Sequence, residues 1–278
     1  MKRENTSGNV AGGARVIIMA MAERAPLYDR IGTTYAASRQ ADPRIARALR
    51  AALGDAETVL NVGAGTGAYE PADLEVTALE PSSVMIAQRP AGSAPVIQGV
   101  AESIPLADDS VDAAMAVISD HHWADRAAGL RELRRVARRR VVLLNSDPAL
   151  AATFWMTRDY LPGFLGLIPP GYREPGRWER DLQRLLGPVT VRPVPLPHDC
   201  LDGFYHAYWR RPRAYLDDEV RDNISVFRRL PAADVHDAVA RLRRDLDDGT
   251  WQDRNSALIG RSEIDLGLRI VVAEPAAG

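Results

Sequence analysis

Short apolar runs alternate with segments of helical periodicity along residues 58–145, and this alternation constrains the fold more than any other feature of the chain. Strands that alternate with helices form parallel sheets, because the connection between two parallel strands must cross over the sheet. The sequence therefore predicts an α/β fold with a doubly wound, mostly parallel sheet. The predicted strands cover 58–62, 76–80, 95–98, 111–119 and 140–145, and the predicted helices cover 82–89 and 126–137.

The segments on either side of this core also have recognisable patterns. Before it, Ile45, Leu49 and Leu53 recur at intervals of four behind Asp42-Pro43, which predicts two short helices within 26–53. After it, a helix at 178–186 and strands at 189–196 and 264–273 bring the predicted sheet to seven strands. The mostly helical stretch between the last two strands is rich in Tyr, Trp and His and too long for a hairpin turn. We expect a flexible N-terminal segment (1–25), an N-terminal helical lid (26–54), an α/β core (55–198 and 263–275) and a helical substrate cap (199–262).

The first predicted strand runs directly into the glycine-rich turn Gly63-Ala64-Gly65-Thr66-Gly67. Glycines at such a turn let the backbone approach a ligand where side chains would block it, which indicates a nucleotide-like cofactor. Gly63, Gly65 and Ala68 also match the dinucleotide fingerprint G-x-G-x-x-G/A. The loop by itself leaves open a dinucleotide, a different nucleotide-like cofactor, or a turn required only for packing.

The next stretch of sequence discriminates between the two cofactors. Only eight residues, Pro71 among them, separate Gly67 from the strand that begins at Val76. A dinucleotide places its pyrophosphate at the N-terminus of the helix that follows the loop, and this connection is too short for that helix. The interval therefore favours a cofactor without phosphate, such as a sulfonium. Glu80, at the end of the second strand, could accept hydrogen bonds from ribose hydroxyls of either cofactor; an exposed strand-end carboxylate is the alternative.

Three stretches, VLNVGAGTG, ALEPS and AESIPLADDSVDAAMAVIS followed by HHW, resemble the class I SAM-dependent methyltransferases in order and spacing. The resemblance covers roughly residues 26–150 and implies a Rossmann-like fold that binds S-adenosyl-L-methionine and releases S-adenosyl-L-homocysteine. It places the glycines at the methionine part, Glu80 at the ribose, Ala101 and Glu102 at the adenine edge, and the end of the fourth strand beside the methyl group. The implied cofactor-binding residues are Tyr35, Arg39, Asn61, Gly63, Ala64, Gly65, Gly67, Glu80, Pro81, Ala101, Glu102, Ile118 and Ser119.

The sequence departs from the family pattern at two positions. Asn61 stands where the family usually has an acidic residue near the cofactor's ammonium group, and Val100 stands where many relatives have Asp or Asn. Nearer the N-terminus, Tyr28, Tyr35 and Arg39 resemble the family's segment that folds over the cofactor. Arg39 could pair its fork with the carboxylate of the methionine part, or be a solvated charge on a helix face.

Two adjacent histidines are the first candidates for a catalytic base. Methyl transfer from a sulfonium is an in-line displacement, so the enzyme mainly supplies alignment, exclusion of water and a base where the nucleophile must lose a proton. His121 and His122 follow the fourth strand, where open α/β sheets bind ligands, and both cannot point inward from an extended segment. Either could be the base, or pack and cap the next helix. Tyr28 is the next candidate.

Two aromatic clusters outside the core could bind an acceptor or form a second hydrophobic core. The candidate substrate-binding residues are Trp155, Tyr160, Tyr205, His206, Tyr208 and Trp209. Residues 61–71 and 199–215 also resemble an actinobacterial subgroup of tailoring methyltransferases, some of which methylate the indole carbon of tryptophan-derived cyclic dipeptides. The resemblance implies an aromatic secondary metabolite as acceptor, possible acceptor atoms being indole C3 or an O or N atom of another natural product.

Composition excludes several other classes. A net charge of −2 gives no electrostatic reason to bind nucleic acid and favours a small neutral substrate. The single cysteine, Cys200, excludes an internal disulfide and a multi-cysteine metal site, which predicts a cytoplasmic protein without a metal. The apolar run at 16–22 is too short to span a membrane, Met21 is a candidate native start, and a homodimer is left open. A NAD-dependent oxidoreductase and a non-catalytic SAM-binding relative are the competing hypotheses.

Overall fold

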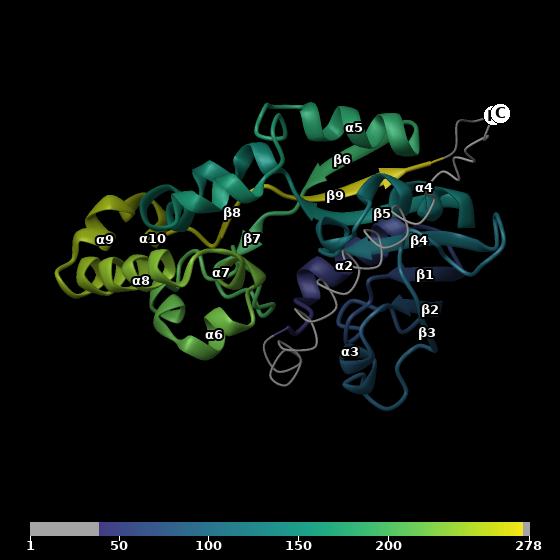
Figure 1. Cartoon of the computed structure of the whole chain (residues 1–278), viewed down its shortest axis with the longest axis horizontal. Helices are drawn as coiled ribbons and strands as arrows, with labels where there is room; N and C mark the ends of the chain where they lie inside the picture. Colours follow the sequence, from purple (N-terminus) through teal and green to yellow (C-terminus); the bar gives the residue numbers. More distant parts are fainter. Residues whose placement is uncertain (1–38, 275–278) are drawn as a thin grey trace, which may run out of the picture.

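The computed structural model describes residues 39–274, and its centre is a seven-stranded sheet (Figure 1). The strand order is β3-β2-β1-β4-β5-β9-β6, in which β9 runs antiparallel to β5 and β6 and the other pairs are parallel. The strands are β1 (Thr58–Val62), β2 (Glu75–Glu80), β3 (Val96–Gln98), β4 (Val111–Val117), β5 (Ala137–Ser146), β6 (Val189–Pro193) and β9 (Leu268–Ala273). The predicted doubly wound, mostly parallel sheet is confirmed.

The central strands are apolar on both faces because helices cover the sheet on both sides. Along β4, Met115 belongs to the hydrophobic cluster on one face, and its neighbours Ala114 and Ala116 belong to the cluster on the other. Along β5, Val142 and Val141 divide in the same way. This alternation with period two buries a nearly continuous apolar run, as expected for a central parallel strand.

Among the described residues, four helices flank the sheet: α2 (Pro43–Leu53), α3 (Ser83–Ala87), α4 (Arg126–Val136) and α5 (Arg177–Leu186). α4 and α5 bury their apolar residues in one cluster, whereas α2 buries Ile45, Leu49 and Leu53 in the other. α2 begins where the Asp42 side chain accepts a hydrogen bond from the backbone N–H of Arg44. The helix was expected to be part of an N-terminal lid, but its apolar stripe packs against β5 and β9, so it belongs to the core. Residues 26–38, the rest of the expected lid, lie outside the described residues.

The connection between β1 and β2 is as short in space as in sequence. Residues 63–74 form turns, and no helix is present between these two described strands. The chain therefore lacks the helix N-terminus that would hold a pyrophosphate behind the glycine loop.

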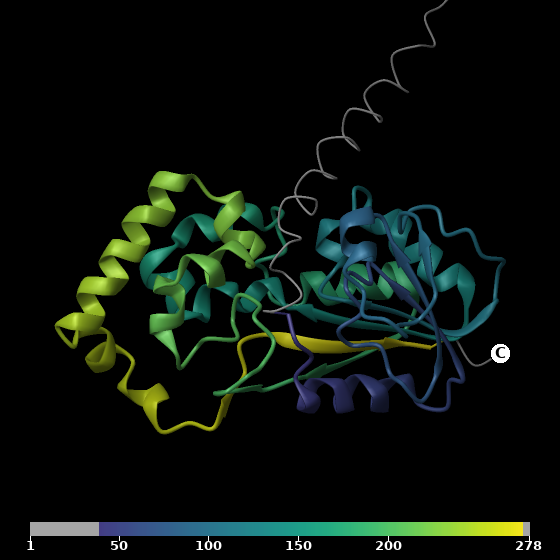
Figure 2. The same ribbon diagram turned by 90° about the horizontal axis from the view of Figure 1, so that it is seen from below.

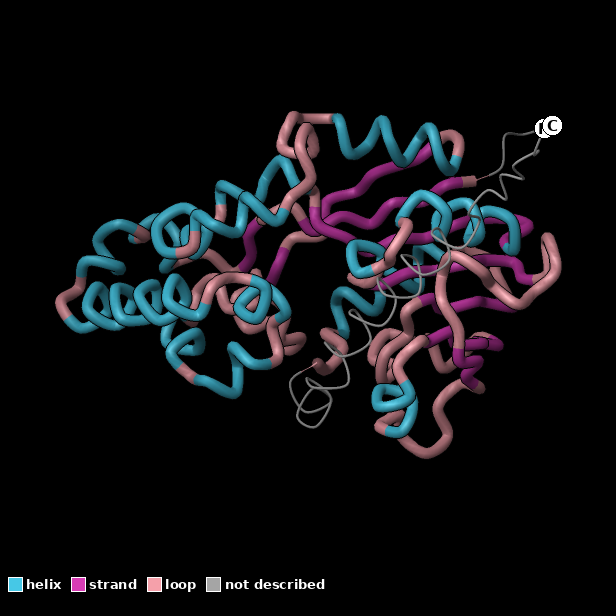
Figure 3. Tube along the Cα trace, viewed as in Figure 1, coloured by secondary structure: helices cyan, strands magenta, loops and turns pink. Residues whose placement is uncertain are grey.

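A second body of the protein, which we call the helical lobe, lies beside the sheet (Figures 2 and 3). It consists of residues 148–168 and 199–262. The first of these segments had been expected in the core, but Phe154 packs edge-on against Tyr205 at 5.3 Å and Trp155 packs against Trp251 at 5.3 Å. The elements of the lobe are η2 (Pro148–Thr153), the π-helix η3 (Met156–Tyr160), η4 (Pro162–Leu167), η5 (Pro212–Leu216), α6 (Asp218–Asp222), α7 (Ser225–Arg229), α8 (Ala232–Asp247), α9 (Thr250–Arg254) and α10 (Ser256–Ile259).

Two predicted strands are broken where the core meets the lobe. The segment 189–196 divides into β6 and the two-residue β7 (Leu196–Pro197), and the segment 264–273 divides into β8 (Glu263–Ile264) and β9. Gly267, with φ of +91°, turns the chain between β8 and β9, and β7 and β8 form a separate two-stranded sheet. Within residues 39–274, no helix is long and apolar enough to cross a lipid bilayer.

Candidate functional site

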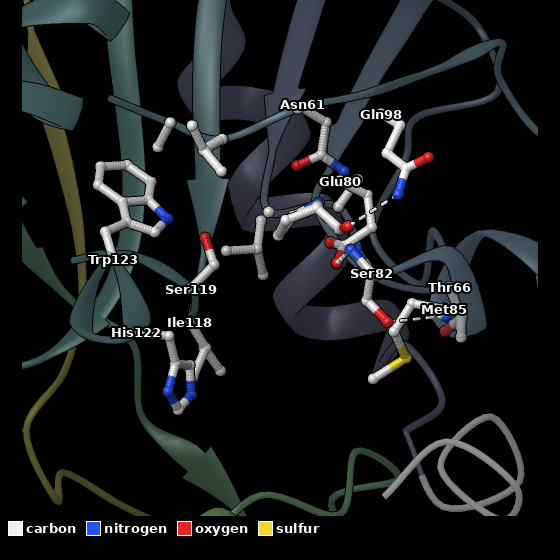
Figure 4. A pocket seen from close by; sticks show the side chains of 18 of the residues that line it. Asn61, Thr66, Glu80, Ser82, Met85, Gln98, Ile118, Ser119, His122 and Trp123 are labelled. Atoms are coloured by element: carbon white, nitrogen blue, oxygen red, sulfur yellow. Dashed lines mark hydrogen bonds between the residues drawn. The ribbon is translucent and has the colours of Figure 1, made fainter. Parts of the chain in front are cut away.

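A cavity of about 460 Å³ opens at the carboxyl ends of β1, β2 and β4 (Figure 4). Open α/β sheets bind ligands at this edge, and the volume suits a small molecule. In Figure 4, Asn61, Glu80 and Gln98 lie on one side of the cavity, and Ile118, Ser119, His122 and Trp123 lie on the other. The sequence-predicted residues that line it are Arg39, Asn61, Gly63, Ala64, Gly65, Glu80, Pro81, Ala101, Glu102, Ile118, Ser119 and His122.

The three glycines of the loop all have positive φ, but a side chain at each would meet different surroundings. A Cβ at Gly63 would lie 2.7 Å from Ser119 Cβ, so this glycine lets the loop pack against the end of β4. A Cβ at Gly65 would meet no atom within 4 Å, which leaves the backbone open to the cavity. Gly67 was expected at the cofactor but does not line the cavity; a Cβ there would lie 3.0 Å from Glu70 Oε2.

Glu80 is buried at the end of β2 with both carboxylate oxygens engaged. Oε2 accepts a 2.8 Å hydrogen bond from the Gly65 N–H, and Oε1 accepts one of 3.0 Å from the Ser82 N–H. Burial raises the pKa of Glu80, and these backbone hydrogen bonds act in the opposite direction. Each oxygen keeps a second lone pair, so the carboxylate is positioned by the loop and can still accept a hydrogen bond from a ligand.

Asn61 is oriented by a buried ion pair behind the loop. Its Nδ2 donates to Glu70 Oε1 at 3.2 Å, and Glu70 pairs with Arg89 at 2.6 Å. Asn61 Oδ1 is buried without a hydrogen-bond partner among the described residues. A buried acceptor left in this state costs free energy unless a ligand supplies a donor.

Arg39 lines the cavity, but its guanidinium group already pairs with a carboxylate of the protein. Arg39 Nε donates to Asp202 Oδ1 at 2.5 Å and Nη2 donates to Oδ2 at 3.3 Å. The fully buried Asp202 also accepts a 3.0 Å hydrogen bond from the Tyr69 hydroxyl. Arg39 therefore links the chain before α2 to the lobe, and its expected pairing with the carboxylate of the cofactor stays a prediction. Tyr28 and Tyr35 lie outside the described residues.

The two residues expected at the adenine edge, Ala101 and Glu102, line the cavity from the loop that follows β3. Ala101 is buried, and Glu102 Oε1 accepts a 2.9 Å hydrogen bond from the Asp125 N–H at the start of α4. The sequence reasoning missed Gln98, whose Nε2 donates to the Pro81 carbonyl at 3.2 Å, and Met85. Gln98 is the last residue of β3, and a polar residue at a strand end was the sequence signal that could have identified it.

A second cavity, of about 430 Å³, lies between the sheet and the helical lobe. Five residues line both cavities, so the two adjoin: Arg39, Ile118, His122, Trp123 and Ala124. At this junction Ile118 has φ of +49°, a conformation that a β-branched residue rarely adopts. Its N–H donates to the Leu144 carbonyl at 2.8 Å, which holds the turn at the end of β4.

Both histidines reach the second cavity because they do not lie on an extended segment. They form the short 3₁₀ turn η1 (Asp120–His122), with ring centroids 3.9 Å apart, and so the expectation that only one could point inward is wrong. His122 lines both cavities, whereas His121 lines only the second. Desolvation by the surrounding protein lowers the pKa of His121 to about 4, although Asp120 acts in the opposite direction.

The candidate substrate residues divide between cavity wall and lobe core. Tyr205 and His206 line the second cavity, and desolvation lowers the pKa of His206 to about 4. The other four do not line it: three of them use their polar groups in hydrogen bonds, and Tyr208 packs its ring against an arginine. Trp155 Nε1 donates to the Trp209 carbonyl, Trp209 Nε1 to the Leu196 carbonyl, Tyr160 to Asp245, and the ring of Tyr208 lies under Arg211.

Further residues of the second cavity gave no signal in the sequence. Trp178, Tyr172, Arg126 and Arg229 line it, although they come from helices and turns far apart along the chain. The packing of α4 against α5 brings the first three together, and the lobe adds Arg229 to them.

Comparison with known proteins gives concordant results. Residues 60–144 match a family model described as a methyltransferase domain. The crystal structure of a methyltransferase assigned to an antibiotic biosynthesis pathway in Anabaena variabilis is 33% identical, covers 85% of this chain and 98% of its own, and superposes with a TM-score of 0.76. An uncharacterized methyltransferase of Mycobacterium tuberculosis is 38% identical over 152 residues, which is 51% of this chain. The chain spans about half (53%) of the length of such curated relatives.

Proposed function

Because the chain belongs to the class I SAM-dependent methyltransferases, we propose that it transfers the methyl group of S-adenosyl-L-methionine to a small molecule bound in the second cavity. The observation that carries this proposal is the meeting of the two cavities at Ile118, His122 and Trp123. One cavity has the glycine loop and the strand-end carboxylate, and the other is enclosed by the lobe. A reaction between two bound molecules requires this adjacency.

The residues of the first cavity fit the cofactor. The buried, unpartnered Asn61 Oδ1 is an acceptor suited to an ammonium group, and the open space at Gly65 lets a ligand approach the backbone. The free lone pairs of Glu80 suit ribose hydroxyls, and Ala101 and Glu102 would lie along the adenine edge. When bound, the cofactor supplies an activated methyl group on a sulfonium.

The side chains at the junction align the acceptor and exclude water. Ile118 and Trp123 form an apolar wall shared by the two cavities, which favours a dry path between acceptor and methyl group. His122 is the group best placed to take a proton from the acceptor atom, because it alone of the two histidines reaches both cavities. His121 lies at the wall of the second cavity only.

The acceptor in this proposal is an aromatic secondary metabolite. Phe164, Leu167, Phe204 and Ile224 give the second cavity a largely apolar wall, and the similar Anabaena structure is assigned to antibiotic biosynthesis. Indole C3 of a tryptophan-derived cyclic dipeptide is one candidate acceptor atom. An O or N atom of another natural product is the alternative.

Calorimetric titration with S-adenosyl-L-homocysteine tests the first part of the proposal, with NADH as the comparison ligand. We expect the homocysteine product to bind and NADH not to bind, since no helix follows the described glycine loop before β2. Absence of product binding at millimolar concentration would refute the proposal. Transfer of labelled methyl groups to a panel of indoles, phenols and amines then tests catalysis.

A further inference from the structure

The acidic side chains on the wall of the second cavity are already engaged by the protein. Asp120 accepts hydrogen bonds from Arg126 Nε at 2.8 Å and from Asn145 Nδ2. Asp147 accepts a 3.0 Å hydrogen bond from the Ala149 N–H at the start of η2. Two arginines of this wall are paired, Arg126 with Asp120 and Arg39 with Asp202, and neither Asp120 nor Asp147 pairs with the third.

That cation is Arg229, the last residue of α7. It is exposed and lines the second cavity, and within residues 39–274 its guanidinium group has no carboxylate within 4.0 Å and no hydrogen bond. Its neighbour Arg228 differs in both respects: it does not line the cavity, and it pairs with Asp222 at 3.5 Å. Arg229 is therefore a cation without an internal counter-charge at the place where the acceptor would lie.

Four charged groups on this wall act on the pKa of His121. The charges that act on its imidazole are Asp120, which favours protonation, and Arg229, Arg39 and Arg126, which oppose it. Of these cations, Arg126 is paired with Asp120 and Arg39 with Asp202, so Arg229 is the one whose charge no carboxylate of the described residues offsets. An unpaired guanidinium group on a cavity wall attracts an anionic group of a ligand.

Resting on the proposed function, we propose that the acceptor carries a carboxylate, which pairs with Arg229 while its ring system packs between Phe164 and Phe204 and its methyl-accepting atom points to His122. Guanidinium and carboxylate form two parallel hydrogen bonds, which would fix the orientation of the acceptor as well as its affinity. The inference favours an acid over a cyclic dipeptide, whose backbone carboxylate is consumed in ring closure.

The test compares indole-3-acetate with indole-3-acetamide, and benzoate with benzamide, on protein saturated with S-adenosyl-L-homocysteine at low salt. We expect each acid to bind wild-type protein about tenfold more tightly than its amide, since a charge-assisted pair exceeds a neutral hydrogen bond by this order. Arg229→Gln should abolish the preference, and the matched Arg228→Gln should retain it. Wild-type protein without a preference for either acid, or a preference retained in Arg229→Gln, overturns the inference.

A second measurement needs no acceptor. NMR titration of His121 should show a higher pKa in Arg229→Gln than in wild-type and Arg228→Gln protein, because one of the opposing cations is removed. An unchanged pKa also overturns the inference. Binding of S-adenosyl-L-homocysteine separates the two claims: its absence refutes the methyltransferase proposal, whereas its presence without acid preference refutes only the carboxylate.

Discussion

Three glycine-to-alanine variants separate what the loop contributes to packing from what it contributes to binding. Gly63, Gly65 and Gly92 all have positive φ, so alanine at each costs about 1–2 kcal/mol of backbone strain. At Gly63 the new Cβ would also lie 2.7 Å from Ser119 Cβ and 2.8 Å from Ser119 Oγ, which adds about 1–3 kcal/mol of overpacking. At Gly65 and Gly92 the new Cβ meets no atom within 4 Å, but only Gly65 lines the cavity.

We therefore expect Gly65→Ala and Gly92→Ala to lower the free energy of unfolding by similar amounts, and Gly63→Ala to lower it by about twice as much or more. Of the two mildly destabilised variants, only Gly65→Ala should weaken binding of S-adenosyl-L-homocysteine, by about tenfold. The methyl group of the new alanine would occupy cavity volume next to Glu80. Gly65→Val, with two further methyl groups, should abolish binding.

Urea unfolding gives the first quantity and isothermal titration the second. The reasoning fails if Gly65→Ala is as unstable as Gly63→Ala, because its Cβ would then have met protein rather than open space. It also fails if Gly65→Ala and Gly92→Ala bind the ligand equally well.

Three further predictions concern the junction, the lobe and pH. His122→Ala should leave binding of S-adenosyl-L-homocysteine unchanged and lower single-turnover methyl transfer about 10²-fold or more; normal turnover would remove His122 from the mechanism. Asp202→Ala leaves Arg39 and the Tyr69 hydroxyl without their buried partner and should cost about 3–5 kcal/mol in urea unfolding, whereas an effect below 1 kcal/mol would contradict the importance of this link. His206 has a pKa of about 4 in the folded protein against an ordinary 6.5, so its stabilising effect is complete above pH 6.5 and is lost as the pH falls toward 4. His206→Asn should flatten this part of the stability profile, and an unchanged profile would contradict it.

The sequence predicted the core well because each core element carries its own local signal. β1 matches its predicted range of 58–62, and α4 and α5 differ from theirs by one residue at an end. Apart from Arg39, the residues at the first cavity lie at or near the ends of β1, β2, β3 and β4 or in the loops that follow them, so placing the strands also placed most of these residues. Gly67 was the exception, since a positive φ and an approach to Glu70 required glycine there without any contact with the cavity.

The sequence predicted the lobe less well because its contacts join distant segments. Arg39 and Asp202 are 163 residues apart, and no periodicity indicates that the fork of Arg39 is already engaged. The aromatic residues of both lobe segments looked alike in sequence, but Trp155 and Trp209 use their indole N–H groups on buried carbonyls, whereas Tyr205 and His206 face a cavity wall. The strand breaks at β7 and β8 follow from the same packing, because the chain must leave the sheet to enter the lobe.

This difference between core and lobe has a functional consequence. The first cavity is built almost entirely from strand ends and the loops after them, whereas the second takes its far wall from η4, α7 and the chain near Tyr205. The two share only five lining residues, namely Arg39, Ile118, His122, Trp123 and Ala124. Substitutions in the far wall can therefore change which acceptor is bound without moving the glycine loop or Glu80, provided that the strained turn at Ile118 keeps His122 at the junction.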